Sequence, residues 1–299
     1  MKKKVLIIGY GSIGRKHAKI LSSFKQISKI YILSKQKKIP YTRINNLSEI
    51  TELNPDYIII STPSSEHHKY LKILEKKLKN KTILVEKPLF NKFYSLRIKK
   101  NKCFVGYNLR FHPVISYLKK IISKKKIWLC KVNCSSYLPD WRKNINYRNS
   151  ASAKKKLGGG ALLELSHELD YVTWLFGDII IKYAFNKKIS NLVINTDDIF
   201  SISATTSKKT FINVNVNFFS RIKKREIIVE GKNLSIHADL NENSINIVKN
   251  NVTKKLNFKN ENTFKIEHQK ILSGNYNKIC SFYQGKKIIK LISKIKKLK

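Results

Sequence analysis

Apolar residues in the first third of the chain form short, unbroken runs separated by segments with helical spacing. The runs occupy residues 4–8, 29–33, 56–61, 82–85 and 103–107, and helical spacing appears at residues 13–24 and 68–79. Strands that are apolar throughout are buried on both faces, which is typical of a parallel sheet between two layers of helices. The pattern predicts a doubly wound α/β domain of the Rossmann type over residues 1–113, with ligands at the carboxyl ends of the strands.

Beyond residue 113 apolar and polar positions alternate instead. The expected helices cover residues 114–123, 161–176, a segment from about 264, and 286–299, and the expected strands cover residues 127–136, 200–205, 211–218, 226–230, 235–239 and 244–249. Strands that follow one another directly favour an antiparallel sheet. We therefore expect residues 114–299 to form an α+β domain on an open, mostly antiparallel sheet. The polar, Asn-rich segment 241–262 is expected to be the most mobile.

The first strand leads directly into a glycine-rich loop with the spacing G-x-G-x-x-G, which begins at Gly9. In this spacing the first glycine permits a tight turn, the second lets the backbone approach a pyrophosphate, and the third allows helix and strand to pack closely. The diphosphate would lie at the helix N-terminus, where free N–H groups and the helix dipole favour an anion. The residues expected to bind a dinucleotide are Gly9, Gly11, Ser12, Ile13 and Gly14. A plain tight turn is the alternative.

The end of the second predicted strand bears on the choice between NAD and NADP. An acidic residue about 20 positions after the loop usually binds the ribose 2′-hydroxyl, but this strand ends in Leu33, Ser34 and Lys35. A hydroxyl and a cation suit a 2′-phosphate, so Ser34 and Lys35 favour NADP(H). Because Lys is abundant throughout the chain, Lys35 is weak evidence by itself, and NAD stays open.

Four further motifs follow the glycine loop. They are Thr62-Pro63-x-x-x-His67, Glu86-Lys87-Pro88, Asn108-x-Arg110-Phe111-x-Pro113, and Gly158-Gly159-Gly160 followed by His167-x-x-Asp170. Together with the loop, this order resembles the Gfo/Idh/MocA family of NAD(P)-dependent oxidoreductases over residues 4–177. The resemblance implies a Rossmann domain, a second domain that binds the substrate, and dimers or tetramers formed through the second domain's sheet. It also implies a sugar, polyol or nucleotide-sugar, oxidised at a secondary hydroxyl or reduced at the ketone.

The residues of these motifs suit hydride transfer. Oxidation of a secondary alcohol requires a group that takes the hydroxyl proton and has a pKa near 7, and His167 meets this description. On a single helix, Glu164 and Asp170 lie three residues before and after His167, so either carboxylate could orient the ring. Lys87 could hydrogen-bond the substrate oxygen and stabilise developing negative charge. The resemblance likewise implies that Lys87 is a catalytic lysine and His167 the acid/base.

One position departs from the family pattern. An Asp commonly stands four residues before the histidine, whereas this chain has Leu163 there and Glu164 one residue later. The proton-relay role of Glu164 is therefore open, and a nucleotide-binding regulator that has lost turnover is an alternative function. Asp170 has the alternative of pairing only within its helix.

The remaining candidate site residues follow from the resemblance and from side-chain type. The resemblance implies cofactor contacts from Thr62, Pro63, His67, Glu86 and Lys87. The expected substrate contacts are Lys87, Asn108, Arg110, Trp141, Arg142 and His167. Trp141 and Arg142 belong to a polar loop, for which surface packing is the alternative. The run Leu138-Pro139-Asp140-Trp141-Arg142 is similar to members associated with surface-polysaccharide sugar synthesis.

The charge balance is strongly basic, with 61 Lys and Arg against 19 Asp and Glu and a net charge of +42. Such a balance is typical of proteins that bind nucleic acids or other polyanions. Only 8 of the 61 are Arg, the residue whose bidentate geometry nucleic-acid recognition favours. The Lys excess accompanies abundant Ile and Asn, as a drift towards A and T in the coding sequence would produce. Polyanion binding is kept as an alternative function.

Cysteine usage and hydropathy complete the picture. Cys103, Cys130, Cys134 and Cys280 show neither C-x-x-C nor metal-ligand spacing, so we expect reduced, buried thiols and no metal. No apolar run approaches the roughly 20 residues of a membrane helix. The basic N-terminus precedes only four apolar residues before the glycine loop, which does not fit a signal peptide. These features predict a cytoplasmic protein.

Overall fold

The computed structural model describes residues 2–142 and 146–298. The chain divides into two compact units. Unit 1 comprises Met1–Asn108 together with Asn262–Ile289, and unit 2 comprises Leu109–Glu261 together with Lys290–Lys299. The division falls within the last helix, α8 (Phe282–Ile295), which therefore contributes residues to both units.

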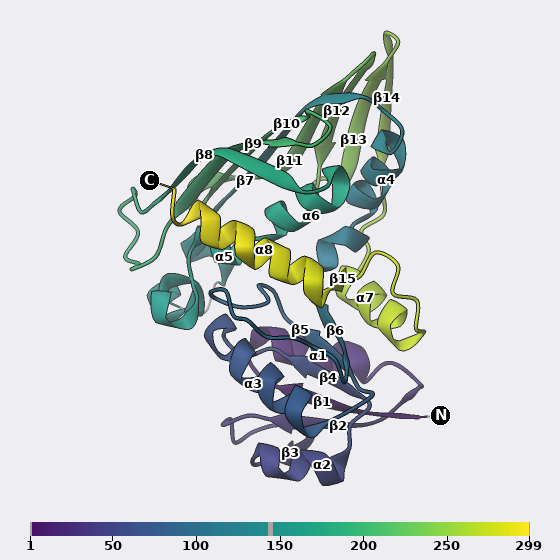
Figure 1. The fold of residues 1–299 in the computed structure, drawn as a ribbon, viewed down its shortest axis with the longest axis vertical. Coiled ribbons are helices and arrows are strands. Elements are labelled where there is room, and N and C mark those ends of the chain that lie inside the picture. The colour runs from purple at the N-terminus through teal and green to yellow at the C-terminus, as the bar shows by residue number, and fades with distance from the viewer. Residues whose placement is uncertain (1, 143–145, 299) are drawn as a thin grey trace. The chain divides into compact units, whose positions relative to one another are not determined.

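Unit 1 is built on a seven-stranded sheet with the order β15-β6-β5-β4-β1-β2-β3 (Figure 1). Its strands are β1 (Lys3–Ile8), β2 (Ile27–Leu33), β3 (Thr42–Ile44), β4 (Tyr57–Ile60), β5 (Thr82–Val85), β6 (Lys102–Val105) and β15 (Cys280–Ser281). All adjacent pairs are parallel except β15 with β6. The centre of the sheet is apolar and almost fully buried in β1 and β4, as a parallel sheet between helices requires. The predicted doubly wound domain is confirmed.

The helices of unit 1 are α1 (Ser12–Leu21), α2 (Ile50–Leu53), α3 (Ser64–Lys77), α7 (Thr263–Leu272) and the first part of α8. Residues 86–101 join β5 to β6 without a helix, as the absence of helical spacing in this segment suggests. The connecting segment instead buries the apolar side chains of Leu89, Phe90 and Ile98. Part of α8 packs here, since Lys286 Nζ donates to Leu96 O (3.0 Å).

The C-terminal part of unit 1 differs from the expected division at residue 113. Strand β15 pairs with β6, and His268 of α7 hydrogen-bonds His17 and Tyr57 inside the unit. Residues 262–289 therefore pack with the Rossmann core, whereas the expected second domain of residues 114–299 included them. Periodicity predicts a helix near residue 264 but contains no information on the distant side chains that receive it.

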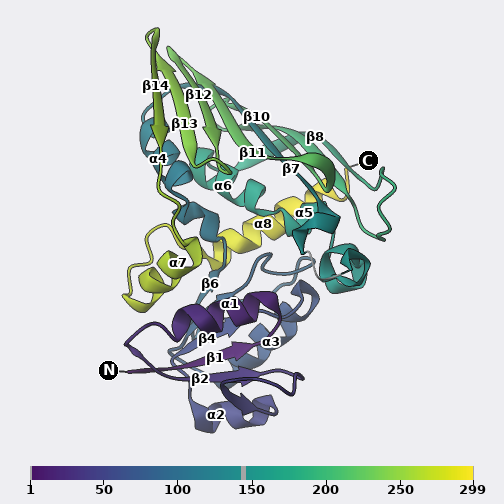
Figure 2. The same cartoon turned by 180° about the vertical axis from the view of Figure 1, so that it is seen from behind.

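Unit 2 is built on an eight-stranded sheet with the order β14-β13-β12-β11-β7-β10-β9-β8 (Figure 2). Its strands are β7 (Ile127–Tyr137), β8 (Ile179–Lys187), β9 (Ile199–Thr206), β10 (Phe211–Asn217), β11 (Phe219–Gly231), β12 (Leu234–Asp239), β13 (Ser244–Lys249) and β14 (Val252–Asn257). Only β7 and β10 pair in parallel, so the predicted mostly antiparallel sheet is confirmed. Strands β13 and β14 form a hairpin within the segment expected to be mobile.

The helices of unit 2 include α4 (Pro113–Ile122), α5 (Ala161–Glu164) and α6 (His167–Phe176), and both views show α4 and α6 on one face of the sheet (Figures 1 and 2). The expected single helix over residues 161–176 is wrong, because the chain breaks at Leu165 and Ser166. Leu165 has φ −103° and ψ 30°, and the next amide bonds, such as Glu168 N–H to Leu165 O (3.3 Å), span three residues.

All four cysteines are buried and none forms a disulfide, as expected. Burial raises the pKa of the Cys103, Cys130 and Cys134 thiols, which disfavours the reactive thiolate. Among the described residues, no helix combines the length and apolar character needed to cross a bilayer.

Candidate functional site

The glycine-rich loop lies between β1 and α1 at the carboxyl edge of the parallel sheet. A Cβ on Gly9, which has φ +95°, would lie 2.8 Å from Thr62 N, and a Cβ on Gly14 would lie 2.1 Å from Gly9 O. Ser61 Oγ, at the end of β4, donates to Gly9 O (2.8 Å) and fixes the loop. A Cβ on Gly11 would meet nothing within 4 Å. Gly9 and Gly14 are therefore required by packing, whereas Gly11 faces open space.

The N-terminus of α1 provides an anion site. Gly11 is its N-cap residue, no side chain caps the helix, and its first turn holds no acidic residue. The first amides of a ten-residue helix are thus available to a ligand, and the helix dipole favours negative charge there. Thr62 Oγ1 lies buried in the adjacent turn without a hydrogen-bond partner among the described residues. An open glycine, an uncapped helix and an orphaned hydroxyl fit the diphosphate of a dinucleotide.

Side chains at the end of β2 occupy the region where the ribose would bind. Ser34 is half-buried, and its Oγ accepts from Gln36 N–H (3.2 Å). Gln36 Nε2 donates to Tyr10 O (2.9 Å), and Arg15 Nη2 donates to Gln36 Oε1 (3.0 Å). The structure thus brings the guanidinium of Arg15, from α1, to the strand end that carries Ser34 and Lys35. Sequence reasoning missed Arg15, although its place directly after the glycine loop was a signal.

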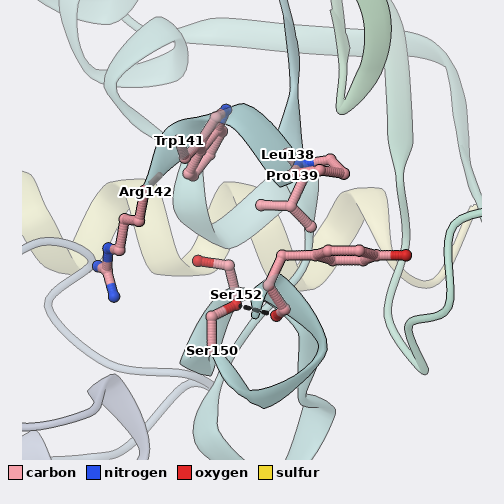
Figure 3. Close-up of a pocket in the computed structure, with 7 residues that line it drawn as sticks. Leu138, Pro139, Trp141, Arg142, Ser150 and Ser152 are labelled. Carbon is pink, nitrogen blue, oxygen red and sulfur yellow. Dashed lines mark hydrogen bonds between the residues drawn. The ribbon is translucent and has the colours of Figure 1, made fainter. Parts of the chain in front are cut away.

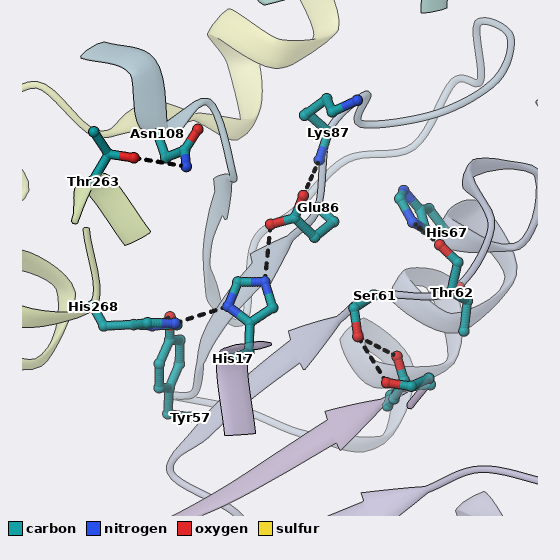
Figure 4. Close-up of polar contacts among 12 residues, drawn as sticks. His17, Tyr57, Ser61, Thr62, His67, Glu86, Lys87, Asn108, Thr263 and His268 are labelled. Atoms are coloured by element: carbon teal, nitrogen blue, oxygen red, sulfur yellow. Dashed lines mark hydrogen bonds and ion pairs between the residues drawn. The ribbon is translucent and has the colours of Figure 1, made fainter. Parts of the chain in front are cut away.

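His67 joins the turn after β4 to the turn after β5. Its Nε2 lies 2.9 Å from Thr62 O and its Nδ1 lies 3.0 Å from Pro88 O (Figure 4). The ring is almost fully buried, and burial lowers its pKa against the opposing effect of these carbonyls. A neutral ring donates to one carbonyl at a time. His67 therefore holds the two turns together, and this position is interior rather than open to a cofactor.

The Glu86-Lys87-Pro88 turn follows β5 at the same sheet edge. The Lys87–Pro88 peptide bond is cis, Lys87 is half-buried and Glu86 is buried. The Glu86 carboxylate accepts from Lys87 N–H (3.2 Å) and from His17 Nε2 (2.9 Å). Glu86 is thus a buried anchor for the backbone of Lys87. Sequence reasoning missed His17 and its partner His268, because nothing in the local pattern of either helix marks them.

Asn108 ends unit 1 and is buried. Its Nδ2 donates to Thr263 Oγ1 at the start of α7 (3.0 Å), so it has a structural contact in addition to its predicted substrate contact. Arg110, two residues later, belongs to unit 2.

Arg110 and Asp170 form a buried, bidentate ion pair. Arg110 Nε donates to Asp170 Oδ2 (2.9 Å) and Nη2 donates to Oδ1 (2.7 Å). The two residues are 2% and 1% exposed. Two predicted site residues are thus brought together, and their side chains bind each other. Arg110 therefore gives part of its hydrogen-bonding capacity to Asp170, and Asp170 is an anchor of α6 rather than an open carboxylate.

His167 is the first residue of α6 and is half-buried. Glu164 ends α5, and its Oε1 accepts from Ser152 Oγ (3.1 Å). Because the two helices are separate, the expected i−3 relation of Glu164 to His167 on one helix is not realised. Asp170, in contrast, does lie three residues after His167 within α6.

The glycine cluster before α5 accommodates a carboxylate of the chain itself. A Cβ on Gly160, which has φ +109°, would lie 2.3 Å from Asp197 Oδ1, and Leu162 N–H donates to Asp197 Oδ2 (2.8 Å). Burial raises the pKa of Asp197, while the nearby Lys296 ammonium opposes this. These contacts give Gly160 a structural role in unit 2.

The loop with Trp141 and Arg142 forms a small pocket together with Leu138, Pro139, Tyr147, Ser150 and Ser152 (Figure 3). Trp141 Nε1 donates to Ser136 Oγ (2.9 Å), and its ring packs edge-on against Phe218. Arg142 is exposed. The cavity volume of about 10 Å³ is room for about one water. Trp141 is thus positioned by packing, and Arg142 remains available to a ligand.

Two domain matches agree with this architecture. Residues 3–100 match the NAD-binding Rossmann fold of an oxidoreductase family, and residues 124–278 match the C-terminal alpha/beta domain of the same family. The fold and the nucleotide site define a nicotinamide-dependent dehydrogenase or reductase that acts on CH–OH groups. The chain belongs to the Gfo/Idh/MocA oxidoreductase family.

Two relatives align with the chain over part of their length. The chain is 25% identical over 237 residues to glucose-6-phosphate 3-dehydrogenase of Bacillus subtilis, covering 71% of this chain and 67% of that protein. It is 27% identical over 163 residues to an uncharacterised oxidoreductase of Synechocystis, covering 51% of this chain and 43% of that protein.

Solved structures share the fold at low identity. Levoglucosan dehydrogenase in complex with NADH has a TM-score of 0.84 and 16% identity, covering 99% of this chain and 96% of that chain. The WlbA dehydrogenase from Bordetella pertussis, in complex with NADH and UDP-GlcNAcA, has a TM-score of 0.80 and 17% identity over the same shares. UDP-N-acetylglucosamine 3-dehydrogenase from Acidithiobacillus ferrooxidans has a TM-score of 0.79 and 14% identity, covering 99% and 97%.

Proposed function

We propose that this protein transfers a hydride between NADP(H) and a secondary alcohol or ketone of a sugar, polyol or nucleotide-sugar. The observation that carries the proposal is the arrangement of groups at the carboxyl ends of the parallel strands in unit 1. There Gly11 and the uncapped N-terminus of α1 follow β1, and Lys87 follows β5, with only β4 between these strands. A dinucleotide bound across this edge would have its diphosphate at α1 and its nicotinamide beside Lys87.

The nicotinamide supplies the hydride chemistry, and the chain supplies positioning and proton transfer. Lys87 donates a hydrogen bond to the reacting oxygen of the substrate and stabilises negative charge there. His167 accepts the hydroxyl proton during oxidation and returns it during reduction. Asp170 acts through Arg110 as a positioning group. The contact of Glu164 with Ser152 supports a structural role for that carboxylate.

A preference for NADP(H) is supported by the residues at the end of β2. Residues 34–38 contain no carboxylate that would repel a 2′-phosphate. Ser34 offers a hydroxyl, Lys35 an exposed ammonium, and Arg15 a guanidinium held beside them by Gln36. Guanidinium groups bind phosphate oxygens through charge-assisted hydrogen bonds. Arg15 therefore adds a third group to Ser34 and Lys35.

A phosphorylated or nucleotide-linked sugar is the substrate class we favour. One relative and two structural neighbours are named for such sugars or hold one. The exposed guanidinium of Arg142 offers a group for a phosphate, and the ring of the preceding residue, Trp141, offers a face for a base or sugar. A role in surface-polysaccharide sugar metabolism fits this class, as does a cytoplasmic location, where such substrates are made.

We also propose a homo-oligomer formed through the helix-free face of the sheet in unit 2. Polar side chains hydrogen-bond to one another along this face, as between Ser201 Oγ and Asn215 Oδ1 (2.6 Å). The exposed apolar residues Ile180, Tyr183 and Phe211 lie on the same face of the sheet. A second copy of this face would cover them, and the mass in solution tests this.

The first test is fluorescence titration with NADH and NADPH. We expect saturable binding by the wild type and none by Gly11→Arg, because the new side chain fills the space above the α1 amides. Ser22→Arg places the same side chain on an exposed position at the opposite end of α1 and should bind normally. Failure of the wild type to bind either nucleotide would overturn the proposal and favour polyanion binding by the lysines.

Activity is then measured with glucose 6-phosphate and UDP-N-acetylglucosamine, following nicotinamide absorbance. Lys87→Ala and His167→Ala should each lower kcat about 100- to 10,000-fold with nucleotide binding retained. If the protein binds nucleotide normally but turns over neither substrate, a catalytically silent regulator is favoured.

A further inference from the structure

A chain of buried hydrogen bonds leads through unit 1 to Glu86 (Figure 4). Tyr57 OH lies 2.9 Å from His268 Nδ1, His268 Nε2 lies 2.8 Å from His17 Nδ1, and His17 Nε2 lies 2.9 Å from Glu86 Oε1. Both histidines are fully buried, and Tyr57 is 1% exposed. Segments from β4, α7 and α1, which are distant in sequence, thus connect to one carboxylate.

The proton positions along this chain follow from its two ends. Burial raises the pKa of Tyr57 well above its usual value, with the Glu267 and Glu86 charges adding to the effect, so its hydroxyl keeps its proton. Burial lowers the pKa of His268 well below its usual value, with His17 adding to the effect, so that ring is neutral. A carboxylate at the Glu86 position can only accept hydrogen bonds.

One arrangement satisfies every group. Tyr57 donates to His268 Nδ1, His268 Nε2–H donates to His17 Nδ1, and His17 Nε2–H donates to Glu86 Oε1. The reverse direction would require a doubly protonated His17. It would also leave the phenol proton of Tyr57 without an acceptor among the described residues, which a buried donor rarely tolerates. All three hydrogen bonds therefore point towards Glu86.

The far side of Glu86 is fixed as well. Its Oε2 accepts from the backbone N–H of Lys87 (3.2 Å). Gly106, at the end of β6, closes the remaining space, because a Cβ there would lie 2.7 Å from Glu86 Oε1. The carboxylate is thus held by His17 on one side and the Lys87 backbone on the other, with the backbone of Gly106 against it.

We propose that Tyr57, His268 and His17 form a positioning relay that fixes Glu86 and, through it, the backbone of Lys87 at the nicotinamide end of the site. The proposal rests on the function proposed above for Lys87. Apolar side chains of similar volume would fill this part of the core without the cost of desolvating polar groups. A purely structural role would leave the kcat of a folded variant unchanged, whereas a positioning role would not.

The direction of the relay can be tested without substrate. Nitrogen NMR of the histidine rings in the full-length protein reports which ring nitrogen carries the proton. We expect each of the two rings, His17 and His268, to carry its proton on Nε2. A doubly protonated His17, or either ring protonated on Nδ1 alone, would overturn the relay whatever the protein's activity.

The positioning role is tested by steady-state kinetics. His17→Leu should lower kcat about 10- to 100-fold, because small misplacement of a reacting group is costly, while nucleotide Kd stays unchanged. His17→Gln keeps an N–H donor near Glu86 and should recover much of the lost kcat. His68→Leu, which changes a half-buried histidine on α3 outside the relay, is the matched control and should be unaffected.

A second variant covers the case in which His17→Leu does not fold. Gly106→Ala leaves the three donors intact and displaces only the Glu86 carboxylate, so it should lower kcat with little change in nucleotide Kd. Full kcat in both His17→Leu and Gly106→Ala would sink the positioning role. If the wild type binds neither nucleotide, the proposed function is wrong. The NMR test of the hydrogen-bond direction is independent of that outcome.

Discussion

Asp170 is bound by Arg110 through two parallel hydrogen bonds, of 2.9 and 2.7 Å, in a region from which water is almost excluded. Arg110 precedes α4 and Asp170 lies on α6, so the pair ties the start of one helix of unit 2 to the first turns of another. Both oxygens of the carboxylate are engaged. The ion pair therefore ties α6, whose first residue is His167, to the segment before α4.

Asp170→Asn is expected to lower the free energy of unfolding by about 3–5 kcal/mol, because it leaves the Arg110 guanidinium buried without its counter-charge. The double variant Arg110→Met/Asp170→Leu should be destabilised less, since it removes both charges together. Urea denaturation followed by circular dichroism measures both. An unfolding free energy within about 1 kcal/mol of wild type for Asp170→Asn, combined with a large loss of kcat, would instead assign Asp170 to the chemistry.

The parallel sheet of unit 1 and the glycine loop at the carboxyl ends of its strands were predictable from sequence. Continuous apolar runs and a glycine loop are both local signals. The same holds for the antiparallel sheet of unit 2, whose strands alternate clearly. The place of α7 was not predictable, since it depends on contacts of His268 with His17 and Tyr57, which are distant in sequence. Local patterns contain no information on such pairings.

The candidate site shows the same limit. Spacing identified Gly11 and Lys87 at the sheet edge, where the structure places them. It also put Glu164 and His167 on one helix, because apolar periodicity continues through the break at Leu165. The partner of Asp170 was hidden as well, since Arg110 lies 60 residues earlier. Contacts that form through tertiary packing alone, such as that of Arg110 with Asp170, are therefore the part of the site that sequence reasoning did not supply.

Cofactor preference should respond to charge at the end of β2. Ser34→Asp is expected to weaken NADPH binding and strengthen NADH binding, because a carboxylate repels a 2′-phosphate and accepts from a 2′-hydroxyl. Arg15→Ala should weaken NADPH binding about tenfold or more, as expected for a lost charge-assisted hydrogen bond, and leave NADH binding unchanged. The ratio of the two dissociation constants, measured by fluorescence, checks both.

Lys37→Ala is the matched control for these variants, because it removes an exposed lysine two residues after Lys35. The ratio of the NADPH and NADH dissociation constants of Lys37→Ala should equal that of the wild type. An equal loss of NADPH affinity in Lys37→Ala and Arg15→Ala would show that general positive charge, rather than a defined 2′-phosphate contact, attracts the nucleotide.

His112 is expected to make unit 2 sensitive to acid. Burial and the charge of Arg225 lower its pKa to about 4, against the effect of the Leu240 backbone, and its Nδ1 is buried without a hydrogen-bond partner among the described residues. In the unfolded chain the pKa returns to about 6.5. Between these values the unfolded state binds a proton that the folded state does not, so stability falls as the pH drops from about 6.5 towards 4.

The lowered pKa of His112 reduces the free energy of unfolding by about 2–3 kcal/mol at the acid end of this range. Urea denaturation at pH 7 and pH 4.5 should therefore show a smaller loss of stability for His112→Leu than for the wild type. His237→Leu, at a half-exposed histidine of the same unit, controls for the removal of a histidine as such. If the wild type and His112→Leu lose the same stability between the two pH values, the acid sensitivity arises from another group.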